Sequence, residues 1–256
     1  MLKDFAISRS YKLALVSDLF FGFINLVVYY FISKTFGSAG AGQFGGATSY
    51  FAFVAVGSTI VIVIQTAISS VSGGVREGQI TGTLEAVAVQ PVTTAELALG
   101  FGTFPVVFAV IRVVMYILIA DIIFGLGLEN PDWLGFILTI MATGLALVVF
   151  GILMGSLVVV FKRSGGIGVI VAFAMGFAGG AFFPIAVLPE WLQVVGRFMP
   201  TRFAFDGVRS ALFEGGAWAG DAAILTTIGL LGTPIALLAF KSAVNLAEAR
   251  GTLSQY

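Results

Sequence analysis

Long apolar stretches separated by short polar segments are the main pattern of this chain between Leu19 and Leu246. A helix needs about 20 mostly apolar residues to cross a bilayer, at a rise of about 1.5 Å per residue. The stretches are continuously apolar and lack the alternation of barrel strands. The pattern therefore predicts an all-α polytopic membrane protein with six transmembrane helices, at residues 18–36, 47–72, 98–126, 133–161, 165–188 and 221–245.

A short segment, residues 1–17, precedes the first expected span. Its basic residues Lys3, Arg9 and Lys12 alternate with apolar ones. Such a pattern is typical of an amphipathic helix that lies in the plane of the membrane interface. Because no internal repeat or low-complexity linker is visible, we expect one membrane domain over residues 1–256.

The basic residues also predict how the chain is oriented. An even number of spans places both termini on one side, and cytoplasmic segments carry an excess of Lys and Arg. With cytoplasmic termini, the inner segments hold eight basic residues: Lys3, Arg9, Lys12, Arg76, Lys162, Arg163, Lys241 and Arg250. The outer segments hold four: Lys34, Arg197, Arg202 and Arg209. We therefore expect a multi-pass protein of the cell membrane with both termini in the cytoplasm.

The composition excludes several classes of protein. With 59% hydrophobic and 10% charged residues and a mean hydropathy of +1.06, the chain has too little polar surface for a soluble globule. Its net charge is zero and its basic residues form no tract, so we expect no nucleic-acid partner. It has no Cys and no His, which excludes disulfides, thiol nucleophiles, imidazole bases and His/Cys metal sites.

The polar segment 73–98 separates the second expected span from the third. Gly73 and Gly74 are expected to end the second span, and Pro91 to end a short helix within the segment. An ordered helix here could transmit force from a cytoplasmic partner into the two spans that it joins. A solvated loop is the plainer alternative.

A second unusual segment, 182–216, precedes the last expected span. Pro184 and Pro189 are expected to end the fifth span, and Pro189 with Glu190 to begin a short helix. Pro200 should stop this helix, and Thr201 could cap a second one. Short helices over 189–216 that carry Trp191 and Arg209 suit the outer membrane interface.

Together these segments resemble the permease subunits of the second ABC exporter class, which includes polysaccharide and drug exporters. The cytoplasmic motif of that family is matched by Arg76, Glu77, Gly82, Thr83, Leu84, Glu85, Pro91, Glu96 and Leu97. The late motif is matched by Pro184, Leu188, Pro189, Leu192, Pro200 and Arg209. Val75 stands where an acid is common, and the spacing at 78–81 is longer than the shortest in the family.

The resemblance implies an ATP-driven exporter in which this chain is a non-catalytic transport subunit. It implies an ABC ATPase subunit as partner, docked on a coupling helix that includes Arg76, Glu77, Thr83, Leu84 and Glu85. It also implies a second permease copy, surrounded by membrane lipids, with ATP and Mg bound by the ATPase and no cofactor on this chain. The sequence has no G-x-x-x-x-G-K-[ST] phosphate loop of its own.

Charges within the expected third span are candidates for function. Arg112 lies near its middle, where an unpaired charge costs about 2.5–3.5 kcal/mol on insertion scales. Asp121 follows nine residues later and is half a turn out of phase, so the two do not share a helix face. A role in the translocation path and a membrane ion pair are both open interpretations for Arg112 and Asp121.

Two other functions compete with the exporter. An ion-coupled secondary transporter would need carboxylates deep in the spans, and a membrane-embedded enzyme would need a catalytic constellation such as H-E-x-x-H. Asp121 lies near the outer end of its span, and the sequence has no such motif. The scarcity of hydrogen-bonding side chains in the spans favours a hydrophobic or amphipathic substrate: a lipid, a hydrophobic drug or a lipid-linked glycan.

Overall fold

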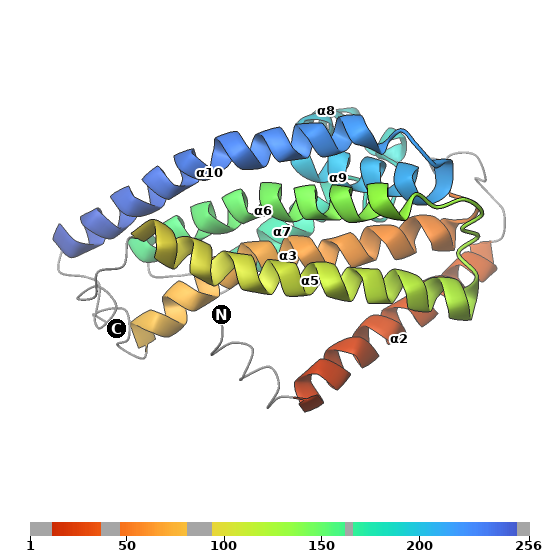
Figure 1. Ribbon diagram of the computed structural model, residues 1–256, viewed down its shortest axis with the longest axis horizontal. Coiled ribbons are helices and arrows are strands. Elements are labelled where there is room, and N and C mark those ends of the chain that lie inside the picture. The colour runs from red at the N-terminus through yellow and green to blue at the C-terminus, as the bar shows by residue number, and fades with distance from the viewer. Residues whose placement is uncertain (1–11, 37–46, 81–93, 162–165, 250–256) are drawn as a thin grey trace.

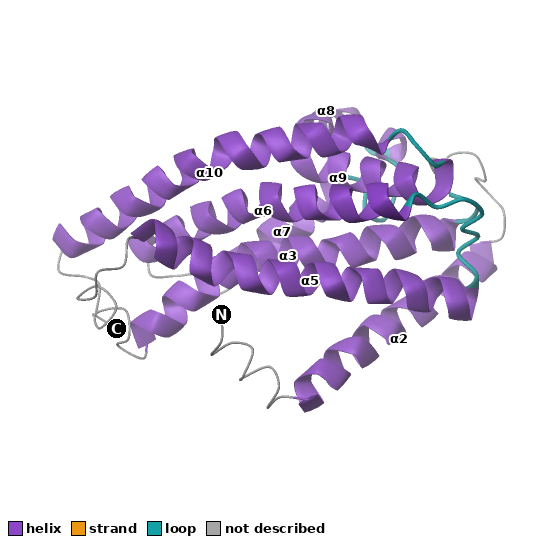
Figure 2. Cartoon of the chain, in the orientation of Figure 1, coloured by secondary structure: helices purple, strands orange, loops and turns teal. Residues whose placement is uncertain are grey.

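A computed structural model describes residues 12–36, 47–80, 94–161 and 166–249 of the chain (Figure 1). Within these ranges the regular elements are all helices and no strand occurs, as Figure 2 shows. The α-helices are α2 (Lys12–Phe36), α3 (Tyr50–Ile80), α5 (Thr94–Phe124), α6 (Trp133–Phe161), α7 (Ile167–Ala178), α8 (Glu190–Phe198), α9 (Pro200–Arg209) and α10 (Trp218–Ala249). A 3-10 turn, η1 (Ile185–Val187), and a π-helical turn, η2 (Ser210–Glu214), complete them. The expected all-α fold is confirmed.

The long helices α3, α5, α6 and α10 lie side by side along the long axis, and α2 leans away from them (Figure 1). The short helices α8 and α9 lie at one end, here named the α8–α9 end, together with the loop that joins α5 to α6. At the opposite end, α3 ends at Ile80, α5 begins at Thr94 and α6 ends at Phe161.

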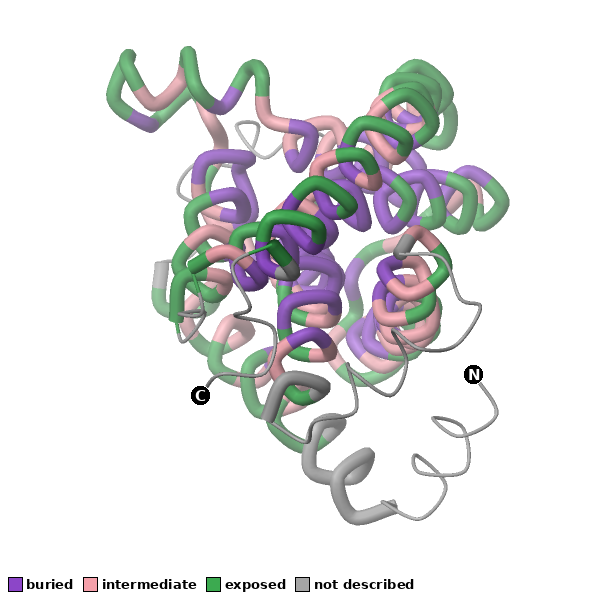
Figure 3. Tube along the Cα trace, turned by 90° about the vertical axis from the view of Figure 1, so that its left-hand side faces the viewer, coloured by how far each residue is buried: buried purple, intermediate pink, exposed green. Residues whose placement is uncertain are grey.

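The core is built around α3. In its most apolar window 78% of the residues are buried, against 22% for α10, which makes α3 the central helix and α10 a peripheral one. Viewed along the bundle, buried residues gather in the middle and exposed ones at the periphery (Figure 3). Helix α3 packs against α5, α6 and α7, while α10 packs mainly on α6.

Four of the described helices are long and apolar enough to cross a membrane: Tyr50–Glu77, Ala95–Phe124, Trp133–Phe161 and Trp218–Ala247. They correspond to the second, third, fourth and sixth expected spans. The outer face of α5 carries exposed apolar side chains at helical spacing, namely Val107, Ile111, Met115, Leu118 and Ile122. Such a stripe is stable in contact with lipid and would be costly in water.

The expected fifth span, 165–188, is wrong in its second half. Helix α7 ends at Ala178, and its 12 residues rise about 18 Å, less than the roughly 30 Å hydrocarbon core of a bilayer. Gly180 then adopts a positive φ of 92°, which glycine tolerates and which turns the chain. The first expected span is also short in its described apolar part, Phe20–Thr35, although α2 is helical from Lys12. Residues 1–11 of the expected lead-in helix lie outside the described residues.

The glycine pair at 73–74 does not end the second span as expected. Helix α3 continues through both residues to Ile80. A Cβ on Gly74 would lie 2.7 Å from the ring of Phe101 on α5, so this glycine permits close approach of the two helices. Residues 73–80 of the expected coupling segment are therefore the last turns of α3.

Asp132 ties three elements together at the α8–α9 end. Its carboxylate accepts hydrogen bonds from the Gly135 backbone N–H at 2.9 Å and from the Trp218 indole N–H at 2.6 Å. Its own backbone N–H donates to the Ala211 carbonyl at 2.8 Å. The carboxylate thus caps α6 and holds the start of α10 against it. The bond from Gly135, followed by that from Trp218, lowers the pKa of Asp132 below its ordinary value.

We expect Asp132→Asn to lower the thermal unfolding midpoint at neutral pH. The folded-state pKa is depressed, so the stabilisation is present above the unfolded pKa near 4 and is lost as the pH falls through the folded value. The difference between wild type and variant should therefore narrow below about pH 4. Unfolding midpoints in detergent between pH 3 and pH 8 check this. A difference independent of pH would contradict it.

Candidate functional site

A polar stripe runs along one face of α3, the central helix, at Ser58, Gln65 and Ser69. The hydroxyls of Ser58 and Ser69 donate to the carbonyls of Ala55 at 3.0 Å and Gln65 at 2.6 Å, so the helix itself satisfies them. The side-chain amide of Gln65 is exposed and has no hydrogen-bond partner in the part of the chain that the structure describes. An amide facing hydrocarbon is costly, so this face of α3 is suited to a polar surrounding.

An open pocket of about 210 Å³, here named the aromatic pocket, lies beside this stripe between α2, α3, α5 and α7. It is lined by Gly22, Asn25, Leu26, Tyr29, Ser58, Thr59, Val61, Ile62, Gln65, Tyr116, Phe173 and Phe182. The ring of Phe182 lies 6.2 Å from Phe173 and 6.3 Å from Tyr29, centroid to centroid. The lining thus combines amides and hydroxyls with aromatic rings, an arrangement that fits an amphipathic molecule.

The side chain of Arg209, at the end of α9, is buried within the protein. Only 4% of its surface is exposed, and the expectation that its helix lies at the outer membrane interface stays a prediction. Its Nη2 donates to the carbonyls of Phe53 at 3.1 Å, Gly180 at 3.0 Å and Ala181 at 3.2 Å. The guanidinium carbon lies 3.5 Å from the centroid of the Phe53 ring. Arg209 thus connects α9 to α3 and to the turn that ends α7.

Burial lowers the pKa of Arg209 to about 9, and the negative charge of Asp206 opposes this shift. The guanidinium is therefore charged at neutral pH. Its three carbonyl acceptors and the face of the Phe53 ring replace part of the hydration that it loses. A buried cation held in this way fixes the position of the turn that follows α7.

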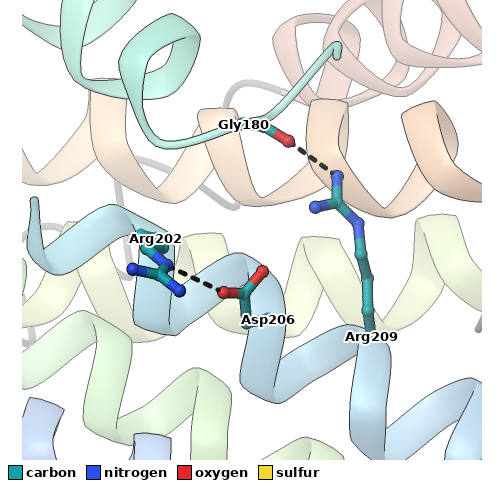
Figure 4. A network of polar contacts seen from close by, with 4 residues as sticks. All are labelled: Gly180, Arg202, Asp206 and Arg209. Atoms are coloured by element: carbon teal, nitrogen blue, oxygen red, sulfur yellow. Dashed lines mark hydrogen bonds and ion pairs between the residues drawn. The ribbon is translucent and has the colours of Figure 1, made fainter. Parts of the chain in front are cut away.

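The short helices α8 and α9 begin near the predicted prolines. Pro189 is the N-cap of α8, and Trp191 is 69% exposed on that helix, as suits an interfacial position. Pro200 is in the first turn of α9, but Thr201 does not cap it; the Thr201 hydroxyl donates to the Met175 carbonyl at 2.8 Å and ties α9 to α7. The same helix carries an ion pair of Arg202 with Asp206, 3.2 Å apart (Figure 4).

The expected coupling residues are only partly described. Arg76 and Glu77 lie near the C-terminal end of α3, and Glu96 lies in the first turn of α5 at the same end of the bundle. Thr83, Leu84 and Glu85 lie outside the described residues.

The two charges of the expected third span both lie in α5. Arg112 and Asp121 are each half-buried there. Their functional roles stay predictions.

A comparison with protein-family models identifies the chain. The model for ABC-2 type transporters matches residues 4–213, which covers most of the sequence and includes α2 to α9. The chain belongs to the ABC-2 type transporter family. It is therefore a membrane protein and a transport subunit. A search of curated proteins gave no match to it.

Two residues of the aromatic pocket were not predicted from the sequence. Gln65 and Asn25 each stand as a lone amide inside an apolar run. That isolation is a usable signal, because a polar side chain within a span is costly unless it faces protein or water. The buried position of Arg209 had no comparable local signal, since its acceptors are backbone carbonyls from distant segments.

Proposed function

We propose that this chain is the membrane-spanning subunit of an ATP-driven exporter, which works as a pair of permease copies with a separate ABC ATPase. Membership of the ABC-2 family supports this proposal, and the sequence has no phosphate loop of its own. ATP and Mg are then bound by the ATPase. The chain converts motion of that partner into transport.

The face of α3 that carries Gln65 lines the translocation path in this proposal. The observation that carries it is the exposed amide of Gln65, near the middle of a helix that is otherwise mostly buried and apolar. In lipid that amide would lack hydrogen-bond partners, whereas a path between two copies supplies water or substrate. The adjoining aromatic pocket is suited to a substrate with both apolar and hydrogen-bonding parts. A lipid, a hydrophobic drug or a lipid-linked glycan has this character.

The orientation follows from charge. The α8–α9 end faces outside the cell in this proposal, and both termini and the segment between α3 and α5 face the cytoplasm. The excess of basic residues in the inner segments supports this assignment. The ends of α3 and α5 that flank residues 81–93 then meet the ATPase.

We expect Glu85→Lys and Thr83→Trp to uncouple the permease from its ATPase without unfolding it. Both positions belong to the proposed docking segment and to no apolar span, so the membrane helices keep their packing. ATP-driven transport in inside-out vesicles should be lost, together with co-purification of the ATPase. Lys241→Glu, a charge reversal at an exposed position of α10, is the control and should leave both intact. Intact docking and transport in both variants, or transport driven by a proton gradient without ATP, would contradict the proposal.

We expect Gln65→Leu to reduce transport roughly fivefold, because one hydrogen bond to the passing substrate contributes about 1 kcal/mol. Folding and ATPase docking should be unchanged. The matched control is Asn245→Leu, which replaces an exposed amide on α10 outside the aromatic pocket. Equal transport by wild type and the Gln65 variant would contradict the proposal that α3 lines the translocation path.

A further inference from the structure

A second pocket, here named the arginine pocket, opens at the α8–α9 end and has a volume of about 300 Å³. It lies between α8, α9, η1 and the turn after α7. Its lining comprises Phe53, Gly179, Gly180, Pro184, Ile185, Ala186, Gln193, Arg197, Arg202, Asp206 and Arg209. It shares no residue with the aromatic pocket.

The arginine pocket carries an excess of positive charge. Three guanidinium groups line it, from Arg197, Arg202 and Arg209, against one carboxylate, Asp206, which leaves a net charge of +2. Asp206 pairs with Arg202 at 3.2 Å (Figure 4). Asp221 of α10 interacts electrostatically with both members of that pair but does not line the pocket. Arg197 and Arg209 form no ion pair within 4 Å in the described part of the chain, although the charge of Asp206 also acts on Arg209.

The donors of these two guanidiniums are incompletely used. Arg209 donates to backbone carbonyls through Nη2 alone, so its Nη1 has no acceptor in the described part of the chain and, unlike Nε, is not fully buried. Arg197 is exposed and forms no ion pair within the described ranges. Buried or pocket-lining donors of this kind are stabilised by an anion with several oxygens.

The position of α8 indicates where in the membrane the pocket lies. Gln193 and Arg197 are four residues apart on one helix face and line the pocket. The other face carries four exposed apolar side chains: Trp191, Val194, Val195 and Phe198. A helix with these two faces lies in the membrane interface, with its apolar side toward the acyl chains. The pocket is therefore at the depth of the lipid headgroups.

We propose that the arginine pocket binds a phosphate group. Guanidinium forks match the oxygens of phosphate in a bidentate manner, and phosphate is the anion found at headgroup depth. A phosphodiester of a membrane lipid and inorganic phosphate share this chemistry. Arg197 and Arg209 bind the phosphate oxygens. Arg202 also binds them once its guanidinium releases the Asp206 carboxylate.

Binding is measured on the purified full-length chain in a neutral detergent, with dihexanoyl-phosphatidylglycerol as the probe, by isothermal titration calorimetry. Arg197→Gln should weaken binding about tenfold, the loss of one charge-assisted hydrogen bond. Asp206→Asn should strengthen binding severalfold, since it removes the one negative charge of the pocket. The matched control is Lys34→Gln, which removes an exposed cation outside the pocket and should change affinity less than about twofold.

Competition with inorganic phosphate distinguishes the two possible ligands, free phosphate and the phosphodiester of a lipid. Displacement of the lipid probe by phosphate, sensitive to Arg197→Gln, assigns the pocket to the phosphate group alone; a lack of displacement assigns it to the lipid. Two results would overturn the proposal: equal affinity of wild type and the Arg197 variant, or weakening by Lys34→Gln as large as by Arg197→Gln. The measurement needs no ATPase, so it does not depend on the proposed transport function.

Discussion

Arg209→Met should destabilise the folded chain by about 2–4 kcal/mol, because three buried carbonyls lose their common donor. Methionine fills much of the same space and keeps apolar contact with the Phe53 ring. The loss of stability therefore measures the contribution of the guanidinium group. The carbonyls of Gly180 and Ala181 belong to the turn that ends α7, which no regular helix bonding satisfies. Without Arg209 this turn should detach from α3.

Thermal unfolding in a fixed detergent, followed by size-exclusion chromatography of the unheated sample, measures the effect. Arg202→Met is the matched control, because Arg202 lies on the same helix but is 38% exposed in a surface ion pair. That variant should lose less than about 1 kcal/mol. Equal losses in the two variants would show that the buried position of Arg209 has no special role in stability.

Gly151→Ala should destabilise the bundle by about 1–3 kcal/mol, although alanine favours helices. A Cβ at Gly151 of α6 would overlap the Ala67 carbonyl of α3, a backbone atom that no side-chain rotation can move away. Helices α3 and α6 would have to move apart. This would weaken the core, because the contact between these two helices forms much of it. Small residues allow this close approach in membrane proteins.

The control is Gly100→Ala in α5. Gly100 is exposed, and a Cβ there would meet nothing within 4 Å. This variant should be as stable as wild type or gain about 0.5–1 kcal/mol from helix propensity. If α3 and α6 are in backbone contact, the unfolding midpoint of the Gly151 variant should fall below that of wild type, while that of the Gly100 variant should equal or exceed it in the same detergent. A stable Gly151 variant would contradict that packing.

Helix α6 shows what the sequence can predict. Its bounds, Trp133–Phe161, are those expected from the apolar run, because Pro131 and Asp132 precede it and Lys162 follows it. The short helices α8 and α9 were also predictable, since Pro189 caps the start of α8 and Pro200 lies in the first turn of α9. In each case a local, sharp change in polarity or backbone freedom sets the boundary.

The pattern of apolar residues alone does not predict the end of α7. The apolar run continues past Ala178 to Phe183, so hydropathy alone extends the helix. The chain turns there at a glycine cap, with Gly180 at positive φ and the Ala181 N–H donating to the Gly176 carbonyl. Thr201 and Arg209, more than 20 residues later, then bind carbonyls of this turn. The glycine pair at 179–180 is a local stop signal for the helix, but the bonds from Thr201 and Arg209 that hold the turn come from distant segments and leave no local pattern. Likewise, the glycines at 73–74 suggested a helix end, whereas Gly74 serves the packing of α3 against Phe101.

The central claim is that this ABC-2 family chain is a permease driven by a separate ATPase. Affinity purification of the tagged full-length chain from its native membrane, in mild detergent, tests this most directly. We expect an ABC ATPase subunit with a phosphate-loop sequence to co-purify in stoichiometric amount, and to be absent when the Glu85→Lys variant is the bait. Recovery of the wild-type chain without any ATPase, together with transport that needs only an ion gradient, would contradict the account.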